Sequence, residues 1–239
     1  MTSQAAYSES TRRGGWTPAM VRRLTSRYAV NYADLLPADK TAPVIDLGCS
    51  EGLMLSWLSE LGYTNLWGVD TDPVAVAQAQ ESLGEGVNPA QMAVADIADF
   101  MSAQPDNYAA AVFLNNVIEH LDHEYALRLA SESRRVLAPG GVFVATTGNM
   151  ENPFNLALFA RDFTHRLFFT SNSLRQMLIL AGFEPASASV RPVRYKTTVR
   201  NLPTQVTLPL VGAIVKLVAR SMRIRIDETA PLITAIGRA

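Results

Sequence analysis

The chain has 239 residues, of which 48% are hydrophobic, and its 21 basic and 22 acidic side chains leave a formal net charge of -1. This length and hydrophobic fraction suffice for one large domain, and the near-neutral balance excludes the overall attraction of a strongly basic domain for nucleic acid or anionic lipid. The single cysteine, Cys49, excludes an internal disulfide, and the polar N-terminus lacks the apolar run of a secretion signal. We therefore expect a cytoplasmic protein.

The first predicted elements are a mobile arm over residues 1–16 and a helix that Thr17 and Pro18 begin and that runs to about Leu36. From residue 44, short apolar runs alternate with amphipathic stretches, a pattern typical of βα units and of a mostly parallel sheet. The sequence thus predicts an α/β protein with a single domain over residues 17–239, whose core spans residues 40–192.

The apolar runs predict seven strands, at residues 44–47, 65–69, 91–95, 108–114, 142–146, about 187–191 and 232–236. Helices are expected from the turn at residue 52 to about residue 60, from residue 73, at residues 122–137 and at residues 171–181. Gly62 and Gly182 are expected at two helix ends, and a turn at residues 139–141 follows the helix at 122–137. Two segments break the rhythm. We expect a lid-like insertion at residues 149–170, after the fifth strand, and an apolar and basic insertion at 193–229, before a final strand within 230–239.

Acidic residues follow three successive strands. The first strand runs into Asp46 and a turn at residues 48–52 with glycine at both ends, the second ends at Asp70, and the third ends at Asp96. Ligands bind at the carboxyl ends of strands in open α/β sheets, glycines let the backbone approach a ligand, and a carboxylate about 20 residues after such a turn can accept bonds from both hydroxyls of a ribose. The turn does not have the Gly-x-Gly-x-x-Gly spacing, which disfavours a dinucleotide enzyme.

These motifs together resemble the class I S-adenosylmethionine (SAM) dependent methyltransferases, and in particular the branch similar to the ubiquinone-biosynthesis enzymes. The resemblance spans about residues 40–190, and it is carried by Asp46-x-Gly48-x-Ser50-x-Gly52, Gly68-Val69-Asp70, Asp96-Ile97, Asn116-Val117-Ile118-Glu119-His120-Leu121 and Leu137-Ala138-Pro139-Gly140-Gly141. It implies a Rossmann-like methyltransferase fold with a seven-stranded, mostly parallel sheet flanked by helices.

The resemblance also implies a set of SAM-binding residues. Around the methionine part it places Asp46, Gly48 and Cys49 with the backbone of Asn115; around the ribose Asp70; and around the adenine Asp96 and Ile97. Gly52 and Thr71 complete the expected set. Ser50 departs from the family, which usually has a central glycine there.

Methyl transfer from a sulfonium needs alignment and, for a hydroxyl acceptor, a base. The candidates are His120, after the fourth strand, and His165, in the first insertion, whereas His123 is expected on a helix surface. The alternative for each candidate is a histidine that satisfies local backbone groups. In some relatives the resemblance implies a divalent metal held by Glu-x-x-Glu-His, but Asn116 stands here in place of the first glutamate, so we expect no metal.

The first insertion is similar to a segment of methyltransferases from glycan and natural-product pathways. Its phenylalanines either wall an acceptor pocket or form the core of the insertion, and its arginines are candidates to hold a phosphate or carboxylate; these are Phe154, Phe159, Phe163, Phe168, Arg161 and Arg166. In the second insertion, basic residues bracket the apolar run at 206–218. An ordinary buried helix beside a solvated basic face is the favoured interpretation. The alternatives are weak contact with a membrane surface or a lipid-linked substrate, and a dimer or lid surface.

The leading functional hypothesis is O-methylation of a hydroxyl on a small molecule or saccharide. N-methylation and carboxyl methylation would use the same cofactor crevice. A non-catalytic domain that binds SAM for regulation is the rival from another class. No nucleic-acid partner is expected, because the net charge is near zero and no basic module is appended.

Overall fold

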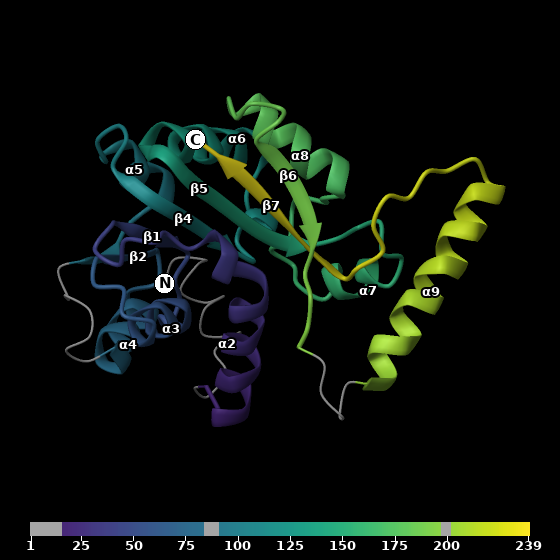
Figure 1. Ribbon diagram of the computed structural model, residues 1–239, viewed down its shortest axis with the longest axis horizontal. Helices are drawn as coiled ribbons and strands as arrows, with labels where there is room; N and C mark the ends of the chain where they lie inside the picture. The colour runs from purple at the N-terminus through teal and green to yellow at the C-terminus, as the bar shows by residue number, and fades with distance from the viewer. Residues whose placement is uncertain (1–15, 84–90, 197–201) are drawn as a thin grey trace.

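The computed structural model describes residues 16–83, 91–196 and 202–239 (Figure 1). The expected mobile arm therefore lies outside the described residues, apart from Trp16. The described chain forms a central sheet with helices on both of its faces.

In the described ranges the sheet has seven strands in the order β3-β2-β1-β4-β5-β7-β6. Strands β3, β2, β1, β4 and β5 are parallel, whereas β7 runs antiparallel to both β5 and β6. The expected mostly parallel, Rossmann-like sheet is confirmed. The strands are β1 (Val44–Leu47), β2 (Leu66–Asp70), β3 (Met92–Val94), β4 (Ala109–Asn115), β5 (Leu137–Gly148), β6 (Ala188–Pro192) and β7 (Leu232–Arg238).

Two groups of helices cover the two faces of the sheet (Figure 1). One hydrophobic core lies between the sheet and α5 (Ile97–Ser102), α6 (His123–Val136) and α8 (Ser171–Leu180). The other lies between the sheet and α2 (Pro18–Tyr32), α3 (Leu53–Glu60) and α4 (Pro73–Leu83). Short 3-10 helices follow α2 at Ala33–Leu35 and β4 at Ile118–His120.

Local signals in the sequence set several helix boundaries. The side chain of Asp122 accepts a hydrogen bond from the backbone N–H of Tyr125 and begins α6. Thr170 and Ser173 form a reciprocal capping box at the start of α8. Gly62 and Gly182 have φ of +87° and +95°, so both expected helix ends occur at a glycine in the left-handed region.

Two local expectations are wrong. We expected β5 to begin after a turn at residues 139–141, but it begins at Leu137, which pairs with Ala109, and a register shift between Ala109 and Ala111 accommodates Gly140 at φ +80°. The sequence also gave no indication of α5. Its six residues are too few to display a helical period, and Asp96 starts it by accepting hydrogen bonds from the N–H groups of Ala98 and Asp99.

The two insertions differ in how they pack. The first contains α7 (Asn155–Phe159) and returns to the sheet through a bridge between Asn149 and Phe169. The second contains α9 (Leu202–Ser221), which stands at the outer edge of the molecule (Figure 1). The favoured expectation of a buried helix is wrong, because most of its described apolar side chains are exposed. No helix in the described ranges is long and apolar enough to cross a membrane.

Candidate functional site

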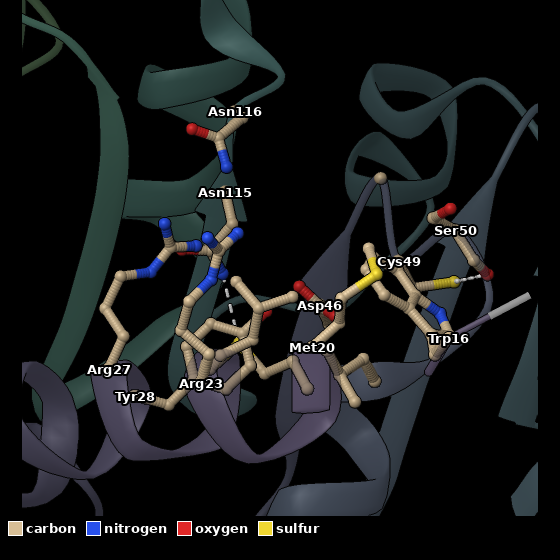
Figure 2. Close-up of a pocket in the computed structure, with 14 residues that line it drawn as sticks. Trp16, Met20, Arg23, Arg27, Tyr28, Asp46, Cys49, Ser50, Asn115 and Asn116 are labelled. Atoms are coloured by element: carbon tan, nitrogen blue, oxygen red, sulfur yellow. Dashed lines mark hydrogen bonds between the residues drawn. The ribbon is translucent and has the colours of Figure 1, made fainter. Parts of the chain in front are cut away.

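A cavity of about 310 Å³ lies where the carboxyl ends of β1 and β4 face helix α2 (Figure 2). Side chains from these three elements and from the start of α3 surround it. Four expected SAM-binding residues, Asp46, Gly48, Cys49 and Asn115, are among its walls. The remaining lining residues are Trp16, Met20, Arg23, Leu24, Arg27, Tyr28, Ser50, Leu53, Met54 and Asn116.

The turn after β1 has an unusual backbone. Gly48, Ser50 and Gly52 all have positive φ, at +71°, +48° and +75°. Glycine is needed at position 48 also because an added Cβ would overlap a methyl group of Val117. Ser50 carries the cost of a left-handed conformation in a side-chain-bearing residue, which explains why glycine suits this position in the related proteins.

Two carboxylates, those of Asp46 and Asp70, lie beside this turn. Asp46 is buried, and burial, reinforced by the negative charge of Asp70, raises the pKa of Asp46 to about 8. Asp70 accepts hydrogen bonds from the backbone N–H of Ser50 on one oxygen and of Asp72 on the other, each at 2.9 Å. The fold therefore fixes the orientation of Asp70 and attaches it to the turn that lines the cavity.

Other expected cofactor residues lie beyond the cavity walls. Thr71 follows β2, whereas Asp96 and Ile97 follow β3 at the same edge of the sheet. One oxygen of Asp96 caps α5 and also accepts from the hydroxyl of Tyr125 at 2.7 Å, and Ile97 belongs to a hydrophobic core. Gly52 lies at the base of the turn, beside Ala79.

An ordered chain of hydroxyl groups orients Asn115. Its side-chain oxygen can only accept, so the hydroxyl of Tyr32 donates to it, at 2.6 Å. Tyr32 must then accept from Thr146, at 2.7 Å, and Thr146 must accept from Thr234, at 2.8 Å. The chain joins α2, β4, β5 and β7, and it fixes the side chain of Asn115 at the cavity.

Helix α2 contributes residues that the sequence interpretation missed. The guanidinium groups of Arg23 and Arg27 both reach toward Asn115 in the cavity (Figure 2). In the described part of the chain, the Nε atom of Arg27 is buried and has no hydrogen-bond partner. Such an atom is costly unless a ligand satisfies it. The sequence did contain a signal for this arrangement. Met20, Arg23, Leu24 and Arg27 are three or four residues apart, and this spacing places them on one face of the helix.

The two candidate histidines lie together, although 45 positions separate them in the chain. The ring centroids of His120 and His165 are 4.7 Å apart. Nδ1 of His165 lies 2.9 Å from the backbone oxygen of Phe159, and because a carbonyl only accepts, Nδ1 carries the proton and Nε2 carries a lone pair. The fold therefore brings both predicted bases into one cluster.

The insertion also determines the tautomer of His120. The hydroxyl of Thr164 donates to Asp162 at 2.7 Å, so at its 2.7 Å contact with Nδ1 of His120 it must accept. Burial and the neighbouring His165 lower the pKa of His120, which favours its neutral form. His120 is thus held in the tautomer whose Nε2 carries a lone pair.

Glu119 completes this cluster. Its carboxylate accepts from the hydroxyl of Thr147 at 3.0 Å, and its backbone oxygen accepts from the N–H groups of Arg166 and Leu167. Burial raises the pKa of Glu119. Among the described residues, a potential ligand atom from each of Glu119, His120 and His165 lies within 4.8 Å of the other two. The expectation of no metal considered Glu119 and His120 alone. The fold adds His165 as a third potential ligand.

The remaining candidates in the insertion separate by exposure. Phe159 is buried. Its ring centroid lies 4.0 Å from that of Phe168 and 4.6 Å from that of His165. Phe154 and Phe163 are exposed, Phe163 completely. Phe168 is exposed as well, so the alternative of a core in the insertion holds for Phe159 and not for the other three phenylalanines. Phe159 is also the one whose ring contacts a candidate base. Arg161 and Arg166 have exposed side chains.

The chain is similar to known methyltransferases in sequence. The family described as "Methyltransferase domain" matches residues 20–188. A ribosomal RNA large subunit methyltransferase E of a Caulobacter species is 30% identical over 160 residues, which are 61% of this chain and 69% of that protein. A ribosomal protein L11 methyltransferase of Heliobacterium modesticaldum is 31% identical over 107 residues, 44% of this chain, and the match spans only 31% of that relative's length.

The fold is similar to that of a solved structure over nearly the whole chain. A SAM dependent methyltransferase from Archaeoglobus fulgidus aligns with a TM-score of 0.68 and 18% identity, covering 99% of this chain and 100% of that one. At this level of identity the likeness supports the fold alone.

Proposed function

The chain belongs to the methyltransferase domain family, and from this membership we propose that it transfers a methyl group from SAM to a hydroxyl of a small molecule or saccharide. That it is a class I SAM-dependent enzyme follows from the family. The hydroxyl acceptor is our inference. The observation that carries it is the cluster of Glu119, His120 and His165 at the same end of the sheet as the cavity.

For the cofactor, we assign the methionine end to the cavity and the nucleoside end to the edge beyond it. Asp46, Gly48, Cys49 and Asn115 would surround the methionine part, and the guanidinium of Arg27 would bind its carboxylate, giving the buried Nε atom the partner that it lacks. Asp70, with Thr71 beside it, would bind the ribose. Asp96 and Ile97 would face the adenine, and Gly52 keeps the turn open.

For catalysis, we assign the role of base to Nε2 of His165. SAM, when bound, would supply an electrophilic methyl group, and Nε2 of His165 would accept the proton of the acceptor hydroxyl whose oxygen receives that methyl group. The carboxyl of Glu119 lies beside the ring and would stabilise the imidazolium that forms. Neutral His120 would position the acceptor or share the proton.

Substitution of His165 tests this assignment. The change His165→Ala should lower kcat roughly a hundredfold or more and leave the affinity for SAM nearly unchanged, because a base acts after the cofactor has bound. The matched control is His123→Ala, at the exposed start of α6, which should alter neither quantity. Equal losses in kcat and in SAM affinity would identify His165 as structural.

An acceptor panel tests the chemistry of the transfer. Formation of S-adenosylhomocysteine should depend on hydroxyl compounds, with saccharides and phenols as the first probes. Turnover with amines or carboxylic acids alone would replace O-methylation by N- or carboxyl methylation. Tight SAM binding without turnover on any acceptor class, RNA included, would favour a non-catalytic SAM-binding domain.

Chelation tests the proposal that no metal takes part. A glutamate with two histidines suits first-row transition metals better than magnesium, which prefers oxygen ligands. If His165 is a base, dialysis against a chelator should leave kcat unchanged. Loss of turnover that added zinc, manganese or iron restores would show instead that the cluster binds a metal.

A further inference from the structure

Helix α9 exposes apolar side chains on most of its circumference. Ile214 is 53% exposed and Leu217 is 70% exposed, and the other exposed large apolar residues of α9 and the turn after it are Val206, Leu208, Leu210, Val211, Val218, Met222 and Ile224. A helix that is apolar all round is normally buried. These side chains therefore form a surface that needs a partner, and we call it the α9 surface.

The described part of the protein covers one narrow stripe of α9. Among the described side chains of the helix, Gly212 and Ala219 are buried. Gly212 packs against Thr229 so closely that a Cβ atom would overlap it, and the backbone oxygen of Ala219 accepts from the N–H of Ile224. The covered stripe thus faces the segment that returns from α9 to β7, and the α9 surface points away from it.

Charge is distributed very unevenly along the chain. Residues 185–226 contain eight Lys and Arg and no Asp or Glu, whereas the rest of the chain contains 13 basic and 22 acidic residues. The formal charge of this segment is therefore +8, against -9 elsewhere, and two of its cations are paired in the structure, Arg191 with Asp34 and Arg225 with Asp227. In the described part of this segment, Lys216, Arg220, Arg223 and Arg225 lie on α9 or directly after it.

From this combination we propose that the α9 surface binds an anionic lipid bilayer, with the helix lying along the headgroup region. An amphipathic or apolar helix bordered by basic residues has the chemistry of such a surface, because its apolar side chains enter the acyl boundary while the cations meet the lipid phosphates. RNA would complement the charge but not the apolar side chains. A second copy of the chain would cover the apolar side chains but would bring together two segments that each carry +8.

The α9 surface adjoins the insertion that carries His165. A cleft of about 740 Å³ lies between α9 and this insertion, with Val215 and Ile224 on one side and Met150 and Pro153 on the other. The backbone N–H of Asp227 donates to Glu151 at 3.0 Å and connects the two segments. A bilayer that binds α9 therefore lies next to the insertion.

Flotation of the full chain with lipid vesicles tests the proposal. The protein should float with vesicles of phosphatidylcholine and phosphatidylglycerol at low salt, and much less with phosphatidylcholine alone or at high salt. A cation near an anionic surface strengthens binding roughly fivefold, so Arg220→Gln combined with Arg223→Gln should weaken it about thirtyfold. Ile214→Ser combined with Leu217→Ser should abolish it.

The matched control is Leu180→Ser, which removes an equally exposed leucine, 73% exposed, from α8. This variant should float like the wild type, and circular dichroism should show that all variants are folded. Absence of flotation by the wild type, or flotation that the α9 substitutions leave unchanged, would overturn the proposal. Single-stranded RNA binding that needs the arginines but not Ile214 and Leu217 would overturn it in favour of RNA, and a dimer that the serine variants dissociate would overturn it in favour of a second copy.

Discussion

Binding of SAM should release a proton from Asp46. Because burial and Asp70 raise the pKa of Asp46 to about 8, roughly nine molecules in ten carry a neutral carboxyl there at pH 7 before the cofactor binds. SAM brings a positive sulfonium and a positive ammonium to the cavity that Asp46 lines. A cation at close range typically lowers the pKa of a carboxyl by about 1–3 units, so binding should ionise this one.

The size of the effect follows from this shift. A pKa that falls from about 8 by roughly 1–3 units releases about 0.4–0.9 protons per SAM at pH 7, and it makes binding about five- to fiftyfold tighter at pH 8 than at pH 6. The affinity for SAM must rise with pH, because the ionised carboxylate binds the cation better and a higher pH increases the fraction of that form.

Calorimetry measures both quantities. Titrations in buffers with different heats of ionisation give the number of protons released, and the same titrations at several pH values give the affinity. Asp46→Asn is the control, because it removes the ionisable group while the ionisation of SAM itself stays the same in both proteins. If proton release and pH dependence were identical in wild type and variant, our account of Asp46 would be wrong.

Three further predictions concern residues around the cavity. Arg27→Gln should weaken SAM binding by about 1.5–3 kcal/mol in calorimetry because a charge-assisted hydrogen bond is lost, whereas Arg22→Gln, an exposed change on the same helix, should have no effect; equal affinities of the two variants would contradict the assignment. Tyr32→Phe should lower the free energy of unfolding by about 1–3 kcal/mol, because the half-buried Asn115 and the buried Thr146 each lose a hydrogen-bond partner, and an unchanged denaturation midpoint would contradict the hydroxyl chain. Ser50→Gly should raise the free energy of unfolding by about 0.5–1 kcal/mol because φ at this position is +48°, and a less stable variant would argue against backbone strain there.

The sequence alone determined the features that depend on neighbours in the chain. The run from Val44 to Glu60 forms strand, turn and helix locally, and Asp70 ends the next strand, so spacing was sufficient to predict the positions of the turn and of Asp70. Alternating apolar and amphipathic segments predicted the sheet for the same reason. Boundaries failed where a short element lacks a period, as in α5, or where a glycine lies within a strand, as at Gly140 of β5.

The tertiary structure decided which distant residues meet. The spacing of His120 and His165 did not reveal that the insertion folds back onto the end of β4, where backbone bonds from Arg166 and Leu167 to Glu119 hold it. The tertiary structure also placed Arg27 of α2 at the cavity.

The sequence also could not decide whether α9 is buried or exposed. An apolar run such as residues 206–218 predicts burial, yet whether it is buried depends on whether another part of the protein reaches it. Local hydrogen bonds and side-chain periodicity are properties of a few adjacent residues, and the sequence displays them directly. Contacts between distant segments depend on the path of the whole chain, so only the folded structure decides them.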